Sequence, residues 1–242
     1  MKAPTRPATS FGAAVTAYEL GRPGYAREHV EWLLEGATGR VLDLAAGSGK
    51  LTRSLLALGH EVVAVNPDEK MLARIEGVET VIGTAERIPL ADRSVGAVTV
   101  AQAWHWFDPV AAGAEIARVL TPGGRLALVW NIRDARHPFV AALSEAMGVS
   151  PAEAMIDADR VLEVSGFGEF ERRRFESVPM INAEAIEALV ASRSPWLVAS
   201  PATQAKVLAA VRELVATHPH SAGRRQFEFP MYTACYRADA LA

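Results

Sequence analysis

The sequence predicts an α/β fold in which a mostly parallel β-sheet carries helices on both faces. Three observations support this prediction. First, β-rich apolar runs alternate with amphipathic helical patterns from about residue 28 to residue 148. Second, the β-rich runs are almost continuously apolar, which is typical of strands that are covered on both faces. Third, right-handed crossovers between strands of this kind give a doubly wound sheet.

The first half of the chain is predicted to contain three helices and four strands. Apolar residues at helical spacing predict the first helix over residues 29–36. Gly59 is expected to end the second helix, over residues 48–59, because glycine commonly follows the last helical turn. Pro67 and the acidic residues after it predict the start of a third helix, over residues 67–76. The strands are expected at residues 39–47, 60–66, 78–83 and 94–103.

The second half is predicted to complete a seven-stranded mixed sheet. A helix over residues 109–121 and a Pro-Gly-Gly turn lead to a fifth strand over residues 125–131. A further helix, over residues 151–167, is expected to end at Gly166. Two later segments alternate in polarity, which predicts a hairpin-like pair of half-exposed strands at one edge of the sheet. These two segments are residues 169–178 and 226–237.

The residues between these last two strands predict a helical cap rather than an independent domain. The cap, residues 177–225, contains two helical patterns, one after Asn182 and one from Ser200-Pro201. About fifty residues bury too little apolar surface to fold alone. The whole chain, residues 1–242, is therefore expected to be one domain, with residues 1–15 as a mobile tail.

The composition narrows the classes of partner. The net charge of −3 argues against a nucleic-acid-binding surface, and the short basic run at residues 172–174 is interpreted as a solvated strand face. The single Cys235 excludes an internal disulfide and a cysteine metal cluster, so no metal is expected. No apolar run approaches the ~18 residues that span a bilayer. We therefore expect a cytoplasmic protein with no nucleic-acid or membrane partner.

A turn of small residues follows the first predicted strand. It places Asp43, Ala45, Gly47 and Gly49 between strand and helix, where backbone N–H groups can approach a ligand. The spacing does not match G-x-G-x-x-G, since Ala45 and Lys50 stand where glycines are required. It does not match the phosphate loop either, because no glycine lies five residues before Gly49. A tight turn without a ligand remains an alternative.

The turn resembles motif I of class I S-adenosylmethionine-dependent methyltransferases, in which Asp-x-small-x-Gly-x-Gly follows a strand. The resemblance continues in order through residues 62–72, 83–108 and 115–131 and covers roughly residues 18 to 135. The chain is similar to methyltransferase type 11 proteins, in the bacterial small-molecule branch that includes trans-aconitate methyltransferase. It implies a Rossmann-like fold with a cofactor-covering element at residues 16–36 and a cofactor-binding core at residues 37–135.

The resemblance implies S-adenosylmethionine as cofactor and S-adenosylhomocysteine as product. Asp43 would help to hold the methionine end, and the glycine turn would pass beneath it. The first glycine of the family motif is Ala45 in this chain, so one additional methyl group must be accommodated there. This is unfavourable if the φ of Ala45 is positive. Arg22 would pair with the methionine carboxylate, and Ala85 and Glu86 would lie beside the adenine. The cofactor-binding residues implied are Tyr18, Arg22, Asp43, Ala45, Ala46, Gly47, Gly49, Asn66, Pro67, Met71, Ala85, Glu86 and Gln102.

Two residues depart from the family pattern. Asn66 stands where an acid normally accepts hydrogen bonds from both ribose hydroxyls, and an amide has only one acceptor oxygen. The exchange is expected to cost about 1–2 kcal/mol, or roughly tenfold in affinity. Asp68 either compensates in part or caps the next helix. Gly96 stands where an aspartate usually begins the fourth strand, and its loss is expected to affect stability more than chemistry.

The fourth and fifth strands end in residues that suit an acceptor pocket. His105 is a candidate general base, because its ordinary pKa is suited to proton transfer. Arg133 would suit a carboxylate on the acceptor. For each of these residues a packing or surface role is the alternative. The candidate acceptor-binding residues are Trp104, Trp106, Asn131, Arg133, Arg193 and Trp196.

The sequence therefore predicts transfer of a methyl group from S-adenosylmethionine to a small molecule. A catalytically silent protein that kept the fold and weakened the pocket is the alternative, and Asn66 and Gly96 are its evidence. A nicotinamide-dependent reductase is disfavoured by the fingerprint spacing. The acceptor, the atom that is methylated and the oligomeric state are not encoded in any pattern found.

Overall fold

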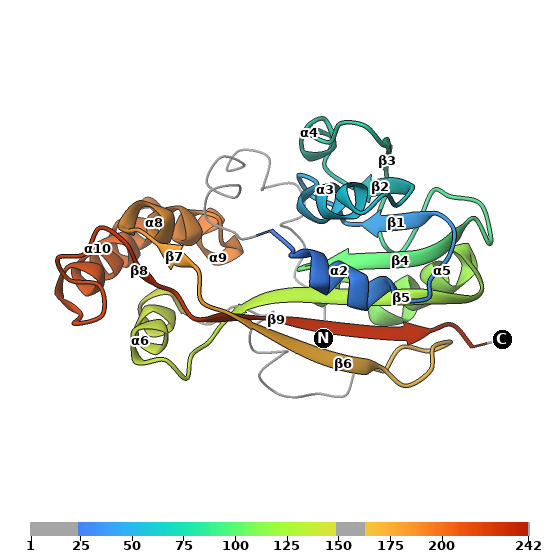
Figure 1. Ribbon diagram of the computed structural model, residues 1–242. Helices are drawn as coiled ribbons and strands as arrows, with labels where there is room; N and C mark the ends of the chain where they lie inside the picture. The colour runs from blue at the N-terminus through green and yellow to red at the C-terminus, as the bar shows by residue number, and fades with distance from the viewer. Residues whose placement is uncertain (1–23, 149–162, 242) are drawn as a thin grey trace. The chain divides into compact units, whose positions relative to one another are not determined.

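The computed structural model describes residues 24–148 and 163–241 (Figure 1). The described residues fall into two compact units. The sheet unit comprises residues 24–130, 163–175 and 233–241, and the helical unit comprises residues 131–148 and 176–232. The predicted helix over residues 151–167 lies mostly outside the described residues, as do Tyr18 and Arg22.

A seven-stranded sheet forms the framework, in the order β3-β2-β1-β4-β5-β9-β6. The pairs β1–β2, β1–β4, β2–β3 and β4–β5 are parallel, while β9 runs opposite to β1 and β4 (Figure 1). The predicted fold class, an α/β mixed sheet of seven strands with helices, is confirmed. The strands are β1 (Val41–Leu44), β2 (Val62–Asn66), β3 (Glu79–Ile82), β4 (Val95–Ala101), β5 (Leu120–Arg133), β6 (Glu171–Ser177) and β9 (Met231–Asp239).

The helices of the sheet unit follow the predicted order, with one correction. Asp68 accepts a hydrogen bond from the Lys70 backbone N–H at 2.9 Å and so caps the third helix, which starts after it rather than at Pro67. The helix also ends early, at Leu72. The helices are α2 (Arg27–Leu34), α3 (Lys50–Ala57), α4 (Glu69–Leu72), the short 3₁₀ helix η2 (Trp104–Trp106) and α5 (Pro109–Val119).

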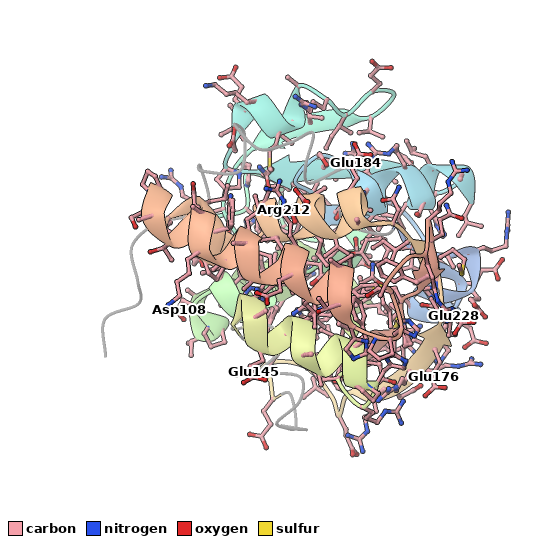
Figure 2. The ribbon with its side chains drawn as sticks, turned by 90° about the vertical axis from the view of Figure 1, so that its left-hand side faces the viewer. Asp108, Glu145, Glu176, Glu184, Arg212 and Glu228 are labelled. Atoms are coloured by element: carbon pink, nitrogen blue, oxygen red, sulfur yellow. The ribbon has the colours of Figure 1, made fainter. Side chains whose placement is uncertain are left out.

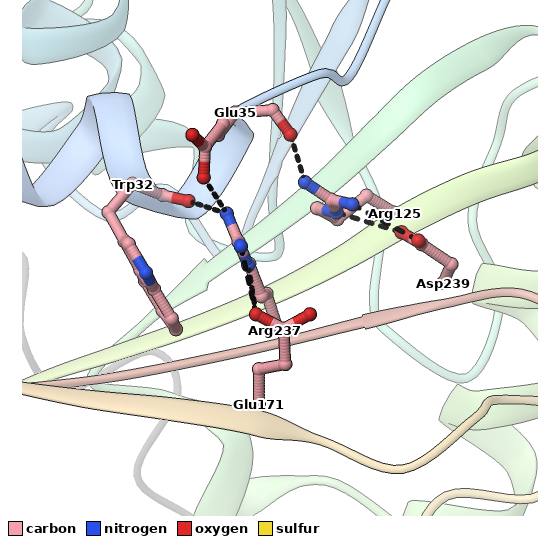
Figure 3. Close-up of polar contacts among 6 residues, drawn as sticks. All are labelled: Trp32, Glu35, Arg125, Glu171, Arg237 and Asp239. Carbon is pink, nitrogen blue, oxygen red and sulfur yellow. Dashed lines mark hydrogen bonds and ion pairs between the residues drawn. The ribbon is translucent and has the colours of Figure 1, made fainter.

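The core of the sheet unit gathers apolar residues from α2 and α3 against the central strands. Leu33 and Leu55 are buried in one cluster with Val41, Ala97 and Val129. Two arginines add hydrogen bonds and ion pairs between the end of α2 and the strands β5, β6 and β9 (Figure 3). Arg237 donates to the Trp32 carbonyl at 2.6 Å and to the carboxylates of Glu35 and Glu171, and Arg125 bonds the Glu35 carbonyl and Asp239.

The helical unit has a core of its own. Phe139 and Leu143 of α6 (Pro138–Met147) pack with Ile186 of α8 (Ala183–Ala191), Val211 of α10 (Pro201–Thr217) and Phe227 of β8. Asn182 and Ser200 cap α8 and α10, which confirms both predicted helix starts. The remaining elements are α9 (Ser194–Leu197), β7 (Met180–Ile181) and β8 (Phe227–Glu228).

The last predicted strand and the predicted cap each have one feature that the sequence did not predict. The predicted strand over residues 226–237 is divided into β8 and β9 around Pro230, which has no N–H to donate to a strand partner. Arg212, labelled in Figure 2, lies on α10. It donates to both carboxylate oxygens of Glu187 on α8, at 2.8 and 2.7 Å. None of the helices in the described ranges is long and apolar enough to cross a membrane.

The structure accounts for Gly96 by close packing of backbones. A Cβ built on Gly96 would overlap the carbonyl oxygen of Thr38 and would lie 2.8 Å from the Thr38 carbonyl carbon. Opposite Gly96, the register between β4 and β5 shifts, from Val95 facing Leu120 to Ala97 facing Arg125. An aspartate has no room here, so glycine at this position is a packing requirement.

Gly96→Ala is expected to lower the free energy of unfolding by about 3 kcal/mol or more, because the added methyl group overlaps the backbone. Urea denaturation measures this change. Gly24→Ala is the control, since no atom lies within 4 Å of a Cβ built there, and it should change stability by less than about 0.5 kcal/mol. Equal effects of the two substitutions would contradict the packing explanation.

Candidate functional site

The predicted ligand residues gather at the carboxyl ends of β1, β2 and β4. From β1 the chain proceeds to β2 and β3 on one side and returns to β4 on the other. In open parallel sheets, the crevice at such a reversal of strand order is where ligands bind. The first two strands end at Leu44 and Asn66, and β4 ends at Ala101.

Asp43 is a buried carboxylate near the end of β1. It is 0% exposed, and its Oδ2 accepts a hydrogen bond of 2.6 Å from the Thr52 hydroxyl on α3. No residue in the described part of the chain bonds its second oxygen, Oδ1. Burial raises the pKa of Asp43 to about 7, while the bond from Thr52 acts in the opposite direction. The site therefore contains a desolvated acid with an unsatisfied oxygen.

The glycine turn adopts left-handed backbone conformations. Ala45 has φ 58°, a positive value that is unfavourable for a residue with a side chain. Gly47 and Gly49 have φ 57° and 83°. Gln102, directly after β4, has φ 57°. A non-glycine residue in this region costs about 1–2 kcal/mol. Such strain clusters at ligand-binding sites, and here two strained residues follow two adjacent parallel strands.

Asn66 uses both ends of its amide to hold backbone. Its Oδ1 accepts from the Gly47 N–H at 3.2 Å, and its Nδ2 donates to the Asp68 carbonyl at 3.3 Å. These partners fix the orientation of the amide, because one supplies a donor and the other an acceptor. The second lone pair of Oδ1 and the second N–H of Nδ2 remain for a ligand. Asn66 is 5% exposed, so its first role is to tie the glycine turn to the start of α4.

The other predicted cofactor residues extend along the same edge. Met71 and Ala85 are each 4% exposed, and Pro67 is half-buried. Ala46 donates its backbone N–H to the Val65 carbonyl at 3.1 Å. Glu86 is exposed, and its Oε1 accepts from the backbone N–H of Asp108 at 3.1 Å. Asp108, labelled in Figure 2, in turn caps α5.

The aromatic group after β4 divides into packed and accessible residues. Trp104 is buried and meets Phe107 edge to face, with ring centroids 5.7 Å apart. The His105 ring lies against Trp106 at 4.7 Å, and Trp106 is 37% exposed. Trp104 is thus a core residue, which agrees with the packing role given as its alternative. His105 is half-buried beside an accessible ring, which suits a group that meets a bound acceptor.

The remaining acceptor candidates belong to the helical unit. Arg133 is buried, and Asn131 and Trp196 are half-buried. Arg193 is 5% exposed and donates to the carbonyls of Met147 and Gly148 at 2.9 and 2.6 Å. These bonds satisfy carbonyls at the end of α6, so Arg193 has a helix-capping role. Contact of these four residues with an acceptor stays a prediction.

Sequence reasoning missed Thr52, which satisfies one oxygen of Asp43. Its signal was a hydroxyl in the first turn of α3, on a helix whose other buried residues are apolar. Missed too were Glu115 and Arg118 on α5, which bond the segment after β3. Charged residues at helical spacing look like a solvated helix face, so the sequence offered no signal for them.

Comparison with known proteins identifies the family. Residues 42–128 match the model of a methyltransferase domain. The sequence is 48% identical to an uncharacterized methyltransferase of Mycobacterium tuberculosis, over 95% of each chain. The chain belongs to the methyltransferase family. This confirms the resemblance on which the residue roles were assigned, while the narrower branch that includes trans-aconitate methyltransferase stays a prediction.

Solved structures share the fold of this methyltransferase. A putative type II methyltransferase from Anaeromyxobacter dehalogenans has a TM-score of 0.65 at 24% identity, over 91% of this chain and 97% of that one. A phosphoethanolamine N-methyltransferase from Haemonchus contortus, in complex with S-adenosylhomocysteine, has a TM-score of 0.53 at 14% identity. That match covers 96% of this chain and 58% of the other. At these identities the likeness concerns the fold alone.

Asp43→Asn is expected to remove a pH dependence of stability. The folded-state pKa of Asp43 is raised from 3.8 to about 7, so its contribution is fully present below pH 4 and is lost as the pH rises through 7. Three pKa units correspond to about 4 kcal/mol at most. Relative to the parent, the variant should therefore gain stability by roughly 2–4 kcal/mol between pH 4 and pH 8.

Chemical denaturation across this pH range measures the difference between variant and parent. Glu213→Gln, at an exposed position on α10, makes the same kind of change from acid to amide and is the control. A constant difference between Asp43→Asn and the parent at every pH would show that the buried carboxyl does not titrate in this range.

Proposed function

We propose that this methyltransferase transfers a methyl group from S-adenosylmethionine to a small-molecule acceptor. The observation that carries the proposal is the buried Oδ1 of Asp43, which has no partner in the described ranges and lies beside the strained turn. A desolvated carboxylate requires a cation or several donors. The ammonium of the cofactor's methionine moiety fits that requirement. The complex of the Haemonchus contortus neighbour with S-adenosylhomocysteine supports the choice of cofactor.

Other residues are proposed to contact different parts of the cofactor. Gly47 and Gly49 let the backbone pass beneath the methionine end, with the N-terminus of α3 directly after them. Asn66 offers one lone pair to a ribose hydroxyl. Ala85 and Glu86 border the adenine, and Pro67 and Met71 pack beside the ribose and base. Tyr18 and Arg22 would cover the methionine end, and both lie outside the described residues.

The reacting end lies after β4. When bound, S-adenosylmethionine supplies a methyl group on a sulfonium that is already strongly activated for transfer. Gln102 faces the methionine side, and Trp104 and Trp106 exclude water from the acceptor. His105 takes the acceptor's proton at a ring nitrogen if that acceptor must be deprotonated. Orientation of the acceptor provides the remaining acceleration.

The acceptor is a small molecule. Arg133 binds a carboxylate on the acceptor through its planar guanidinium, and Asn131, Arg193 and Trp196 contribute polar and aromatic contacts. The reaction takes place in the cytoplasm, which agrees with the single cysteine of the chain.

A catalytically silent binding protein is the second candidate, and one observation favours it. The Asn66 amide is engaged by Gly47 and Asp68, which leaves a weak ribose contact. Gly96 does not favour a silent protein, since close packing against Thr38 explains the glycine at this position. Retention of the Asp43 carboxylate favours the enzyme, because burial of an unneeded acid is costly.

Calorimetric titration tests the proposal. S-adenosylhomocysteine should bind the parent protein, and Asp43→Asn should weaken binding by about tenfold or more, because it removes the charge opposite the ammonium. Glu213→Gln should bind like the parent. Absence of binding at millimolar S-adenosylhomocysteine and S-adenosylmethionine would contradict the proposed function.

Asn66→Asp is expected to change affinity and stability in opposite directions. The added carboxylate oxygen should tighten S-adenosylhomocysteine by about 1 kcal/mol, or roughly fivefold. The same oxygen would face the Asp68 carbonyl, now 3.3 Å from the amide nitrogen, and should lower the free energy of unfolding by about 1–2 kcal/mol.

Calorimetry and denaturation measure these two effects separately. Asn182→Asp is a matched control, since Asn182 caps α8 through the same type of bond to a backbone N–H, at 2.8 Å, in the helical unit. It should leave affinity unchanged. Unchanged affinity in Asn66→Asp as well would mean that the ribose binds elsewhere.

A further inference from the structure

Glu115 and Arg118 of α5 form an ion pair that the proposed function does not use. Arg118 Nε donates to Glu115 Oε1 at 2.7 Å, and Arg118 Nη2 donates to Oε2 at 2.8 Å. The side chain of Arg118 is 30% exposed and that of Glu115 is 23% exposed. The hydrogen bond from Arg118 lowers the pKa of Glu115, so the pair is fully ionised near neutral pH.

This pair also binds the backbone of the segment that follows β3. Arg118 Nη2 donates to the Ile88 carbonyl at 2.8 Å, and Nη1 donates to the Leu90 carbonyl at 2.9 Å and to Asp92 Oδ1 at 2.7 Å. Glu115 Oε2 accepts from the Ile88 N–H at 2.8 Å. One guanidinium thus joins three acceptors of the segment to α5, which requires the planar fork of arginine.

The other end of α5 holds the start of the same segment. Glu86 Oε1 accepts from the Asp108 N–H, directly before the first turn of α5. Ala85 and Ile88 are buried, at 4% and 2% exposure. Residues 85–92 are therefore fixed at both ends by a single helix, and the side chains of Glu115 and Arg118 determine where the segment lies.

We propose that Arg118 and Glu115 are positioning residues that set the adenine-reading end of the cofactor site. The inference rests on the proposed function, which places the adenine beside Ala85 and Glu86. With Oε1 of Glu86 bonded to Asp108, its second oxygen accepts from the exocyclic amine of adenine, and no described residue donates to that oxygen. Hypoxanthine has a carbonyl oxygen at this position and would face the carboxylate, so the segment discriminates between the two bases.

The test compares S-adenosylhomocysteine with S-inosylhomocysteine by calorimetric titration. The parent should prefer the adenine ligand by about tenfold or more. Arg118→Met removes every hydrogen bond that the guanidinium donates. It should raise the Kd of S-adenosylhomocysteine about tenfold and reduce the preference for the adenine ligand to about threefold or less. Arg118→Lys should restore part of the preference, because one charged donor remains. Should Arg118→Met fail to fold, Glu115→Gln replaces it, with a smaller change in the same direction.

Arg212→Met is the matched control, because Arg212 forms a similar two-pronged pair with Glu187 in the helical unit and binds no loop carbonyl through any bond described. It should leave both affinities unchanged. A parent that binds both ligands equally, or Arg118 variants that weaken both ligands to the same extent, would overturn the inference while leaving the proposed function intact. A parent that binds neither ligand would instead overturn the proposed function.

Discussion

The burial of one carboxylate organises the site. Asp43 lies in β1, with one oxygen bonded to Thr52 and the other without a partner in the described structure. An ionised group in this position is unfavourable unless a positive charge arrives with the ligand. Under the proposed function, the neighbouring turn brings the ligand's charged end close to the strand, which accounts for its small residues and the strained backbone of Ala45. In that case the buried acid lowers the stability of the free protein, and the bound ammonium offsets this cost.

The sequence predicted the features that depend on local chemistry. Parallel strands, the glycine turn and the caps at Asn182 and Ser200 follow from residue type and spacing, and the structure contains them. It did not predict what Asn66 and Gly96 contact. Asn66 bonds Gly47, which is distant in sequence, and Gly96 packs against Thr38 from another segment. Such contacts are set by the packed fold, and a single sequence has no local pattern that reports them.

The two tryptophans after β4 have different environments. Trp104 and Trp106 differ in exposure although they are two residues apart, because the short turn η2 directs one ring into the core and the other outward. Arg193 of the helical unit has a role that the sequence did not predict. Its guanidinium donates to carbonyls at the end of α6, whereas its contact with an acceptor stays a prediction. A buried arginine is often required by backbone alone.

The two ends of β4 have different tolerances. At its amino end Gly96 is enclosed by backbone, and at its carboxyl end Gln102 is half-buried in a strained conformation beside the ligand edge. We expect changes at the first position to act on the amount of folded protein in a cell. Under the proposed function, changes at the second act on the turnover of each folded molecule. Within seven residues, a mutational scan that records abundance and activity separately would resolve both kinds of selection on one strand.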